Sequence, residues 1–227
     1  DHETFTAVLR DRYHLRVKNL AIASYATMRE LEALQQYTHG EKVVVIQYCD
    51  NDLGENMQSI RYPRDDFLAR VKGRWTHAAQ EYEHHKKLGW RAPAIDLARR
   101  LIQNDYASHS AYAAQRLDRN VGMEAHLFAL LLARYRSVLE GKHVLVFESS
   151  SYGLNHSQFQ ARFSDELARV VPGLDVQVLD TSRQLERSDY FWLDDHLNVK
   201  GHAQVASMLS AAIAQRGAVT SPHVDDT

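Results

Sequence analysis

The segment Val43-Val44-Val45-Ile46 restricts the fold of this chain more than any other feature. Four consecutive β-branched residues favour an extended strand. No polar residue alternates with them, which indicates that both faces of the strand are buried. Strands of this kind are typical of parallel sheets that carry helices on both faces, so the sequence predicts an α/β fold.

Helix and strand patterns alternate on both sides of this segment. Short apolar runs predict three more strands, at 17–22, 143–147 and 176–179. Apolar residues at helical spacing predict helices around Phe5, Val8 and Leu9; around Met28, Leu31 and Leu34; around Phe159, Phe163 and Leu167; and around Val205, Leu209, Ala212 and Ile213. Thr27 and Glu30 have the spacing of a capping box at the start of the second of these helices.

The segment at about 57–140 is helical in pattern and interrupts the alternation, so it is predicted to be an insertion. We expect one domain at 1–217, with the last helix ending near Gly217 and a polar tail at 218–227. The predicted architecture is a three-layer α/β/α domain with a parallel sheet.

Composition excludes several classes of function. The formal net charge is -2, which lacks the positive excess of a protein that binds nucleic acid. No apolar stretch approaches the ~20 residues of a membrane span. The single cysteine, Cys49, excludes an internal disulfide and a zinc site built on several thiolates.

Two polar segments stand where α/β proteins bind ligands, in loops that follow strands. The first runs from Gln47 to Asp52, directly after the valine strand. The second runs from Asp194 to His202 and leads into the last helix. In the second, an aspartate two residues before His196 can accept a proton from the imidazole Nδ1 and leave Nε2 free as a base. In isolation, a turn with helix-capping residues also explains the first segment, and the second is more often a solvated start of a helix.

Taken together, the two segments resemble the motifs of the SGNH/GDSL hydrolase family. Asn51-Asp52 looks like the Gly-x-Asn-Asp block of that family, with Cys49 in the place of the glycine. Asp194-x-His196-Leu197-Asn198, followed by Gly201-His202, looks like its final block; Asn19 to Tyr25 resembles its second block. The resemblance implies a flavodoxin-like three-layer fold of the SGNH type.

The resemblance also implies a role for each matched residue. His196 would be the catalytic base and Asp194 the acid that orients it. Many family members place the acid three residues before the histidine, but this chain has Leu193 there. The acid is therefore assigned to Asp194, with Asp195 as the alternative. Asn51 and the backbone amide of Ser24 would form the oxyanion hole, while Asp52 and Trp192 would contact substrate.

The Gly-Asp-Ser block of the family, which carries the nucleophilic serine, has no counterpart between residues 1 and 227. We therefore expect the serine, and the first strand of the sheet, to lie upstream of residue 1. That strand would lie between 17–22 and 43–48. The serine run at 149–151 does not replace the missing nucleophilic serine. In permuted relatives the serine follows the acid and the base, whereas this run precedes Asp194 and His196.

The family resemblance implies an ester hydrolase or acyl transferase that needs no metal and no cofactor. Its substrate would be a small-molecule or carbohydrate ester, such as an acetylated carbohydrate of the bacterial envelope, and its location periplasmic or secreted. The alternative is a noncatalytic SGNH-like domain that binds a glycan or a protein. A flavodoxin-like nucleotide binder is disfavoured because the chain has no glycine-rich phosphate loop.

Overall fold

The computed structural model describes residues 3–22, 25–37, 40–73, 87, 97–98, 111–149, 158–191 and 196–220. Three parallel strands form its sheet: β1 (Val43–Tyr48), β2 (His143–Glu148) and β3 (Val176–Leu179). Their order is β1-β2-β3, with Val43 opposite His143 and Val144 opposite Val176. The predicted α/β class and these three predicted strands are confirmed.

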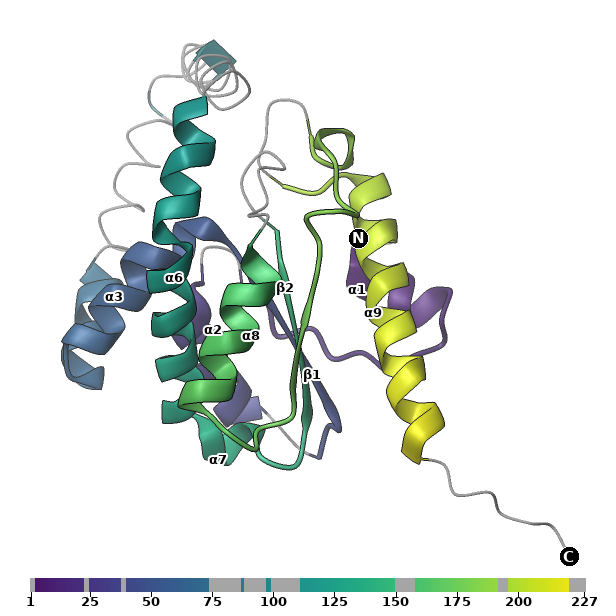
Figure 1. Cartoon of the computed structure of the whole chain (residues 1–227), viewed down its shortest axis with the longest axis horizontal. Coiled ribbons are helices and arrows are strands. Elements are labelled where there is room, and N and C mark those ends of the chain that lie inside the picture. Colours follow the sequence, from purple (N-terminus) through teal and green to yellow (C-terminus); the bar gives the residue numbers. More distant parts are fainter. Residues whose placement is uncertain are drawn as a thin grey trace, which may run out of the picture.

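Helices cover both faces of the sheet (Figure 1). One face carries α2 (Thr27–Tyr37), α3 (Leu53–Arg61), α6 (Ala111–Arg134), the short α7 (Arg136–Leu139) and α8 (Phe159–Val170). The other face carries α1 (Phe5–Asp11) and α9 (Val199–Thr220). Residues 64–73 are also helical. Within the described ranges, no helix has the length and apolar character of a membrane span, as the sequence predicts.

Two apolar cores follow from the alternation of side chains along the strands. Val44, Ile46 and Tyr48 of β1 face the core shared with α2, α6 and α8. Leu145 and Phe147 of β2 face the second core, against α1 and α9. All six residues of β2 are buried, because this strand has a neighbour on each edge and helices on each face.

Residues 17–22 were expected to form a strand, and this prediction is wrong: the structure assigns no strand at 14–22. Leu15 and Val17 pack against the second core, but Ile22 is 50% exposed. Asn19 Oδ1 accepts a hydrogen bond from the Ala21 amide at 3.0 Å, so part of the segment is bonded locally. An apolar run becomes a strand only when a neighbouring strand pairs with its backbone, and the described residues provide none.

Two helix boundaries also differ from prediction. Thr27 is the first residue of α2 rather than its cap, because its hydroxyl bonds to residues outside the helix. The last helix does not end at Gly217 but runs to Thr220, which shortens the predicted tail. The predicted insertion is helical at both of its described ends; its middle, including Trp75 and Trp90, lies outside the described residues.

Two methionines in neighbouring helices allow a matched test of the core. Met28 in α2 is fully buried, whereas Met57 in α3 is 46% exposed. We expect Met28→Ala to lower the free energy of unfolding by about 2–5 kcal/mol, because it leaves a cavity. Met57→Ala should change it by less than about 0.5 kcal/mol. Urea denaturation followed by circular dichroism measures both values, and equal losses would contradict the packing described above.

Candidate functional site

The three strands are parallel, so the described turns that follow β1 and β3 begin at the same end of the sheet (Figure 1). The 3₁₀ helix η1 (Asp50–Asp52) comes directly after β1 and continues into α3. The loop after β3 leads through the 3₁₀ helix η3 (Arg187–Asp189) to the start of α9. Parallel sheets bind their ligands at this carboxyl edge, so it is the place to look for a site.

Asn51 is exposed on η1, one turn beyond the end of β1. The Asp52 amide donates to the Cys49 carbonyl at 3.0 Å, which closes the turn beneath it. Burial raises the pKa of the Cys49 thiol, so it stays protonated at neutral pH and is not a nucleophile. Asn51 is the most exposed residue of this turn, since Asp50 is partly buried and Asp52 is buried.

Asp52, by contrast, is 6% exposed and faces inward. Thr27 Oγ1 donates to Asp52 Oδ2 at 3.4 Å, and Asn56 Nδ2 donates to Thr27 Oγ1 at 3.2 Å. This chain of hydrogen bonds joins η1 to the first residue of α2 and to α3. The sequence analysis expected Asp52 to contact substrate; its burial makes it a support of the Asn51 turn instead.

Several acidic residues lie close together beneath the turn that carries Asn51. Burial, opposed by a hydrogen bond from the Cys49 backbone, raises the pKa of Asp52 to about 7. Burial and the charge of Asp52 raise the pKa of Glu30 to about 8, and the buried Glu30 Oε2 has no hydrogen-bond partner among the described residues. Arg29 compensates part of the negative charge through two bonds to Glu55, at 2.6 and 2.8 Å. Near neutral pH, protons bound to Asp52 and Glu30 therefore limit the negative charge beneath Asn51, which a second cation would otherwise have to balance.

His196 lies on the second loop, in a short antiparallel ribbon centred on the bridge between Tyr190 and Leu197. The Phe191 amide donates to the His196 carbonyl at 3.0 Å, and the Asn198 amide donates to the Asp189 carbonyl at 2.9 Å. Tyr190 and Leu197 are each 3% exposed and belong to the second core, whereas His196 is exposed.

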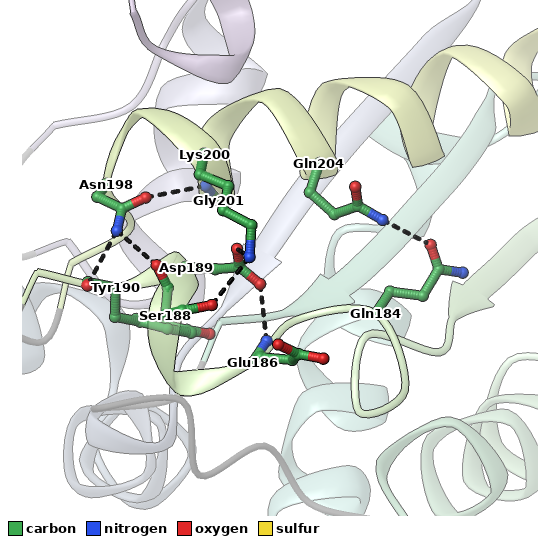
Figure 2. Close-up of polar contacts among 9 residues, drawn as sticks. All are labelled: Gln184, Glu186, Ser188, Asp189, Tyr190, Asn198, Lys200, Gly201 and Gln204. Atoms are coloured by element: carbon green, nitrogen blue, oxygen red, sulfur yellow. Dashed lines mark hydrogen bonds and ion pairs between the residues drawn. The ribbon is translucent and has the colours of Figure 1, made fainter.

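The Asn198 side chain holds this ribbon to the start of α9 (Figure 2). Its Nδ2 donates to the carbonyls of Ser188 at 2.8 Å and Tyr190 at 3.0 Å. Its Oδ1 accepts from the Gly201 amide at 3.1 Å, which satisfies one of the open donors at the first turn of the helix. One amide group thus fixes both strands of the ribbon relative to α9.

Lys200 and Asp189 form an ion pair behind the ribbon, with 2.8 Å between Nζ and Oδ1 (Figure 2). Lys200 Nζ also donates to Ser188 Oγ at 2.8 Å. The hydrogen bond to Asp189 raises the pKa of Lys200, so it remains an ammonium group. A protonated lysine cannot remove the Ser188 proton, and Ser188 is therefore not an activated nucleophile.

His202 stands one turn into α9, with its ring centre 6.0 Å from that of Phe5 in α1. Burial lowers its pKa, and the positive charge that His196 can carry lowers it further. His202 therefore stays neutral at pH 7. This result agrees with a packing role for His202.

The described part of the chain contains three of the six predicted site residues. Asn51 and His196 are both exposed at the carboxyl edge, in the loops after β1 and β3, with β2 between them. Asp52 lies at the same edge but inside. Ser24, Asp194 and Trp192, together with the alternative acid Asp195, lie outside the described residues.

Sequence reasoning missed the residues that shape these loops. Asn198 and Gly201 were noted only as parts of a motif, although Asn198 is a three-way clamp and Gly201 permits a close backbone approach. Asp189 is 2% exposed and carries a capping box with Glu186. Glu148 is fully buried at the end of β2; a charged residue that closes an apolar strand was the signal that could have identified it.

A cavity of about 520 Å³ lies away from this edge, among α2, α6 and α7. Its polar groups pair with one another: Arg64 Nε donates to Glu32 at 2.6 Å, and the Tyr135 hydroxyl donates to the same carboxylate. Residues that line it precede β1 and β2 in the chain, so it lies at the amino ends of the strands. Among the residues that the structure describes, no group of three or more His, Cys, Asp or Glu could hold a metal ion.

Gly201 gives a test of the ribbon. A Cβ atom there would lie 2.2 Å from the Asp189 carbonyl oxygen and 2.9 Å from Leu197 Cδ2. We expect Gly201→Ala to destabilise the protein by about 1–3 kcal/mol and to shift the His196 imidazole signals in NMR spectra. Gly217→Ala is the control in the same helix, because its added Cβ meets nothing within 4 Å and should stabilise by about 0.5–1 kcal/mol. Two equally stable variants would contradict the close approach.

Asp52 predicts a dependence of stability on pH. Its pKa rises from an ordinary 3.8 to about 7 on folding, so the folded state binds this proton more tightly than the unfolded state does. Its contribution is complete below about pH 4 and is lost as the pH rises toward 7, at up to ~1.4 kcal/mol per pH unit. Asp52→Asn should therefore lose less stability than the parent between pH 5 and 8 in urea titrations.

The control for Asp52→Asn is Asp65→Asn, because the Asp65 side chain is 93% exposed. This control should follow the pH dependence of the parent. Glu30, whose pKa is about 8, leaves a residual slope in both variants. Parallel curves for Asp52→Asn and the parent would show that Asp52 does not hold a proton in the folded state.

In comparisons with known proteins, the chain matched no family model, no curated protein and no solved structure. The resemblance to SGNH/GDSL hydrolases therefore stays a prediction that rests on the motif residues.

Proposed function

We propose that this chain forms the main part of a serine-dependent ester hydrolase or acyl transferase of the SGNH type. One observation carries the proposal: an exposed amide, Asn51, and an exposed imidazole, His196, stand at the same edge of a parallel sheet on two separately braced turns. Acyl transfer requires these two kinds of group, a hydrogen-bond donor for the oxyanion and a base for the nucleophile.

His196 is the general base in this proposal. It removes the proton of a serine hydroxyl while the oxygen attacks the ester carbonyl, and then gives this proton to the leaving alcohol as the carbon–oxygen bond breaks. Asp194, two residues earlier, holds the imidazole in position through Nδ1. Neutral His202 supports this role, because it does not compete for the proton.

Asn51 and the Ser24 backbone amide donate hydrogen bonds to the oxyanion. The hydrogen bonds of Asp52 and Thr27 support the turn that carries Asn51, and donors placed before the charge develops stabilise it most effectively. Water then releases the acyl group in a hydrolase, and an acceptor hydroxyl releases it in a transferase. Following the family resemblance, we propose a small ester such as an acetylated carbohydrate as substrate, and a location outside the cytoplasmic membrane.

The nucleophilic serine belongs, in this proposal, to a strand upstream of residue 1 that pairs with the free edge of β1. Lys42 and Tyr48 direct their carbonyls toward β2, so by alternation Val43, Val45 and Gln47 direct their backbone groups away from it. In the described part of the chain, no strand pairs with these groups. A parallel strand there would end beside the Asn51 turn, where the nucleophile is needed.

The test uses the protein expressed from its full reading frame, assayed on a small acetyl ester. We expect turnover that Asn51→Ala lowers about a hundredfold, because one oxyanion donor is typically worth that much or more. His196→Ala should lower turnover by a factor of about 10⁴ or more. Asn120→Ala and His126→Ala, both on α6, are the matched controls and should keep the parent rate.

Unchanged rates in both Asn51→Ala and His196→Ala would show that ester cleavage does not use this site. The alternative, a noncatalytic domain that binds a glycan or a protein, predicts no turnover from the full reading frame and no labelling of a serine by a fluorophosphonate. Labelling that depends on His196 would reject this alternative.

A further inference from the structure

We propose that Phe191 is a substrate-contacting residue that binds the ring of the alcohol part of the ester, and so determines the leaving group that the enzyme accepts. The inference deepens the function proposed above and rests on it. It starts from the one large apolar side chain that the His196 ribbon exposes in the described part of the chain. Phe191 is 51% exposed, although the neighbouring Tyr190 is almost fully buried.

The pairing of the ribbon places Phe191 beside His196. Tyr190 and Leu197 form the bridge, and the Phe191 amide donates to the His196 carbonyl. This one hydrogen bond places the backbones of residues 191 and 196 next to each other, and alternation with Tyr190 and Leu197 turns both side chains to the face opposite that pair. Tyr190 and Leu197 occupy the other face, against the second core. Phe191 and His196 are thus exposed neighbours across the ribbon.

Phe191 is also held in place. Its carbonyl accepts a hydrogen bond from Arg187 Nη1 at 2.9 Å, on the η3 side of the ribbon. The Asn198 clamp fixes the backbone on both sides of the adjacent residue Tyr190. An exposed apolar ring on a fixed backbone loses little conformational freedom when a ligand covers it, so binding there keeps most of the energy gained from the contact.

The proton transfer by His196 determines which part of the substrate Phe191 contacts. His196 must deliver its proton to the leaving oxygen, so the alcohol part of the ester lies next to the imidazole in the transition state. The acyl part and the oxyanion lie toward Asn51. Phe191, exposed next to His196 across the ribbon, is therefore placed to contact the alcohol. A phenyl ring packs well against another aromatic ring or against the C–H face of a sugar.

The kinetic test compares benzyl acetate with methyl acetate, using the full reading frame. The two esters share an acyl group and have leaving alkoxides of similar basicity, so they differ mainly in the ring. We expect Phe191→Ala to raise KM for benzyl acetate about five- to tenfold, with kcat and the methyl acetate values nearly unchanged. Phe191→Tyr keeps the ring and should restore the benzyl preference. Benzyl butyrate should respond to Phe191→Ala as benzyl acetate does.

A binding test on the chain 1–227 does not depend on catalysis. Benzyl alcohol, the product, is titrated into the protein while the His196 imidazole signal, assigned with His196→Gln, is followed by NMR. We expect a saturable shift that Phe191→Ala removes. Tyr37→Ala should keep the shift: Tyr37 is as exposed as Phe191, at 51%, but lies at the end of α2. Because Phe191 is at the surface, all of these variants should fold with the thermal midpoint of the parent.

The two tests separate failure of the inference from failure of the proposed function. A saturable shift that needs Phe191, together with no ester turnover, would retain the binding site and reject the esterase. Turnover in which Phe191→Ala affects methyl and benzyl esters alike, or neither of them, would reject the role of Phe191 and retain the esterase. A shift that is also lost in Tyr37→Ala would overturn the assignment of the ring to this site.

Discussion

The structure depends on burying β2 completely. A strand with no exposed residue needs a neighbour on each edge and apolar helices on each face, and the chain provides β1, β3 and the two helical layers. This arrangement leaves no place for polar chemistry along the strands themselves. Exposed polar groups with a fixed backbone can occur only where the strands end, and the turns after β1 and β3 carry Asn51 and His196 at that edge. The location of the candidate site is thus a consequence of the core.

The two turns are fixed in different ways. The turn that carries His196 is held by backbone pairing and by the neutral amide of Asn198, which satisfies carbonyl groups and a helix amide together. The turn that carries Asn51 is held through a carboxyl group, Asp52, and a hydroxyl from another helix. Neutral hydrogen bonds are insensitive to pH, whereas a buried carboxyl group changes its charge when it releases its proton. The turn that carries Asn51 therefore rests on a carboxyl group that changes its charge near neutral pH.

Sequence patterns correctly predicted the secondary structure that depends mainly on neighbouring residues in the chain. The β-branched run at 43–46 and the runs at 143–147 and 176–179 became strands, because their apolar character and the helices that flank them agree. The run at 17–22 has the same character and is not a strand, since pairing depends on a partner that no local pattern reveals. Thr27 was expected to cap α2, but the capping signal cannot show that Asn56, 29 positions later in the chain, donates to the same hydroxyl oxygen. The edge that carries Asn51 and His196 followed from fold class alone, whereas the Asn198 clamp and the inward turn of Asp52 required the tertiary structure.

The different supports set opposing demands on the proposed chemistry. A general base acts only in its deprotonated form, which favours higher pH. Asp52 and Glu30 release their protons at about pH 7 and 8, and each release adds a negative charge beneath the oxyanion donor Asn51. Negative charge close to a developing oxyanion opposes the stabilisation that Asn51 supplies. Arg29, already paired with Glu55, offsets only part of this charge. The base and the oxyanion donor are therefore best served at different pH values, and the overlap of the two ranges limits where acyl transfer at this edge can be efficient.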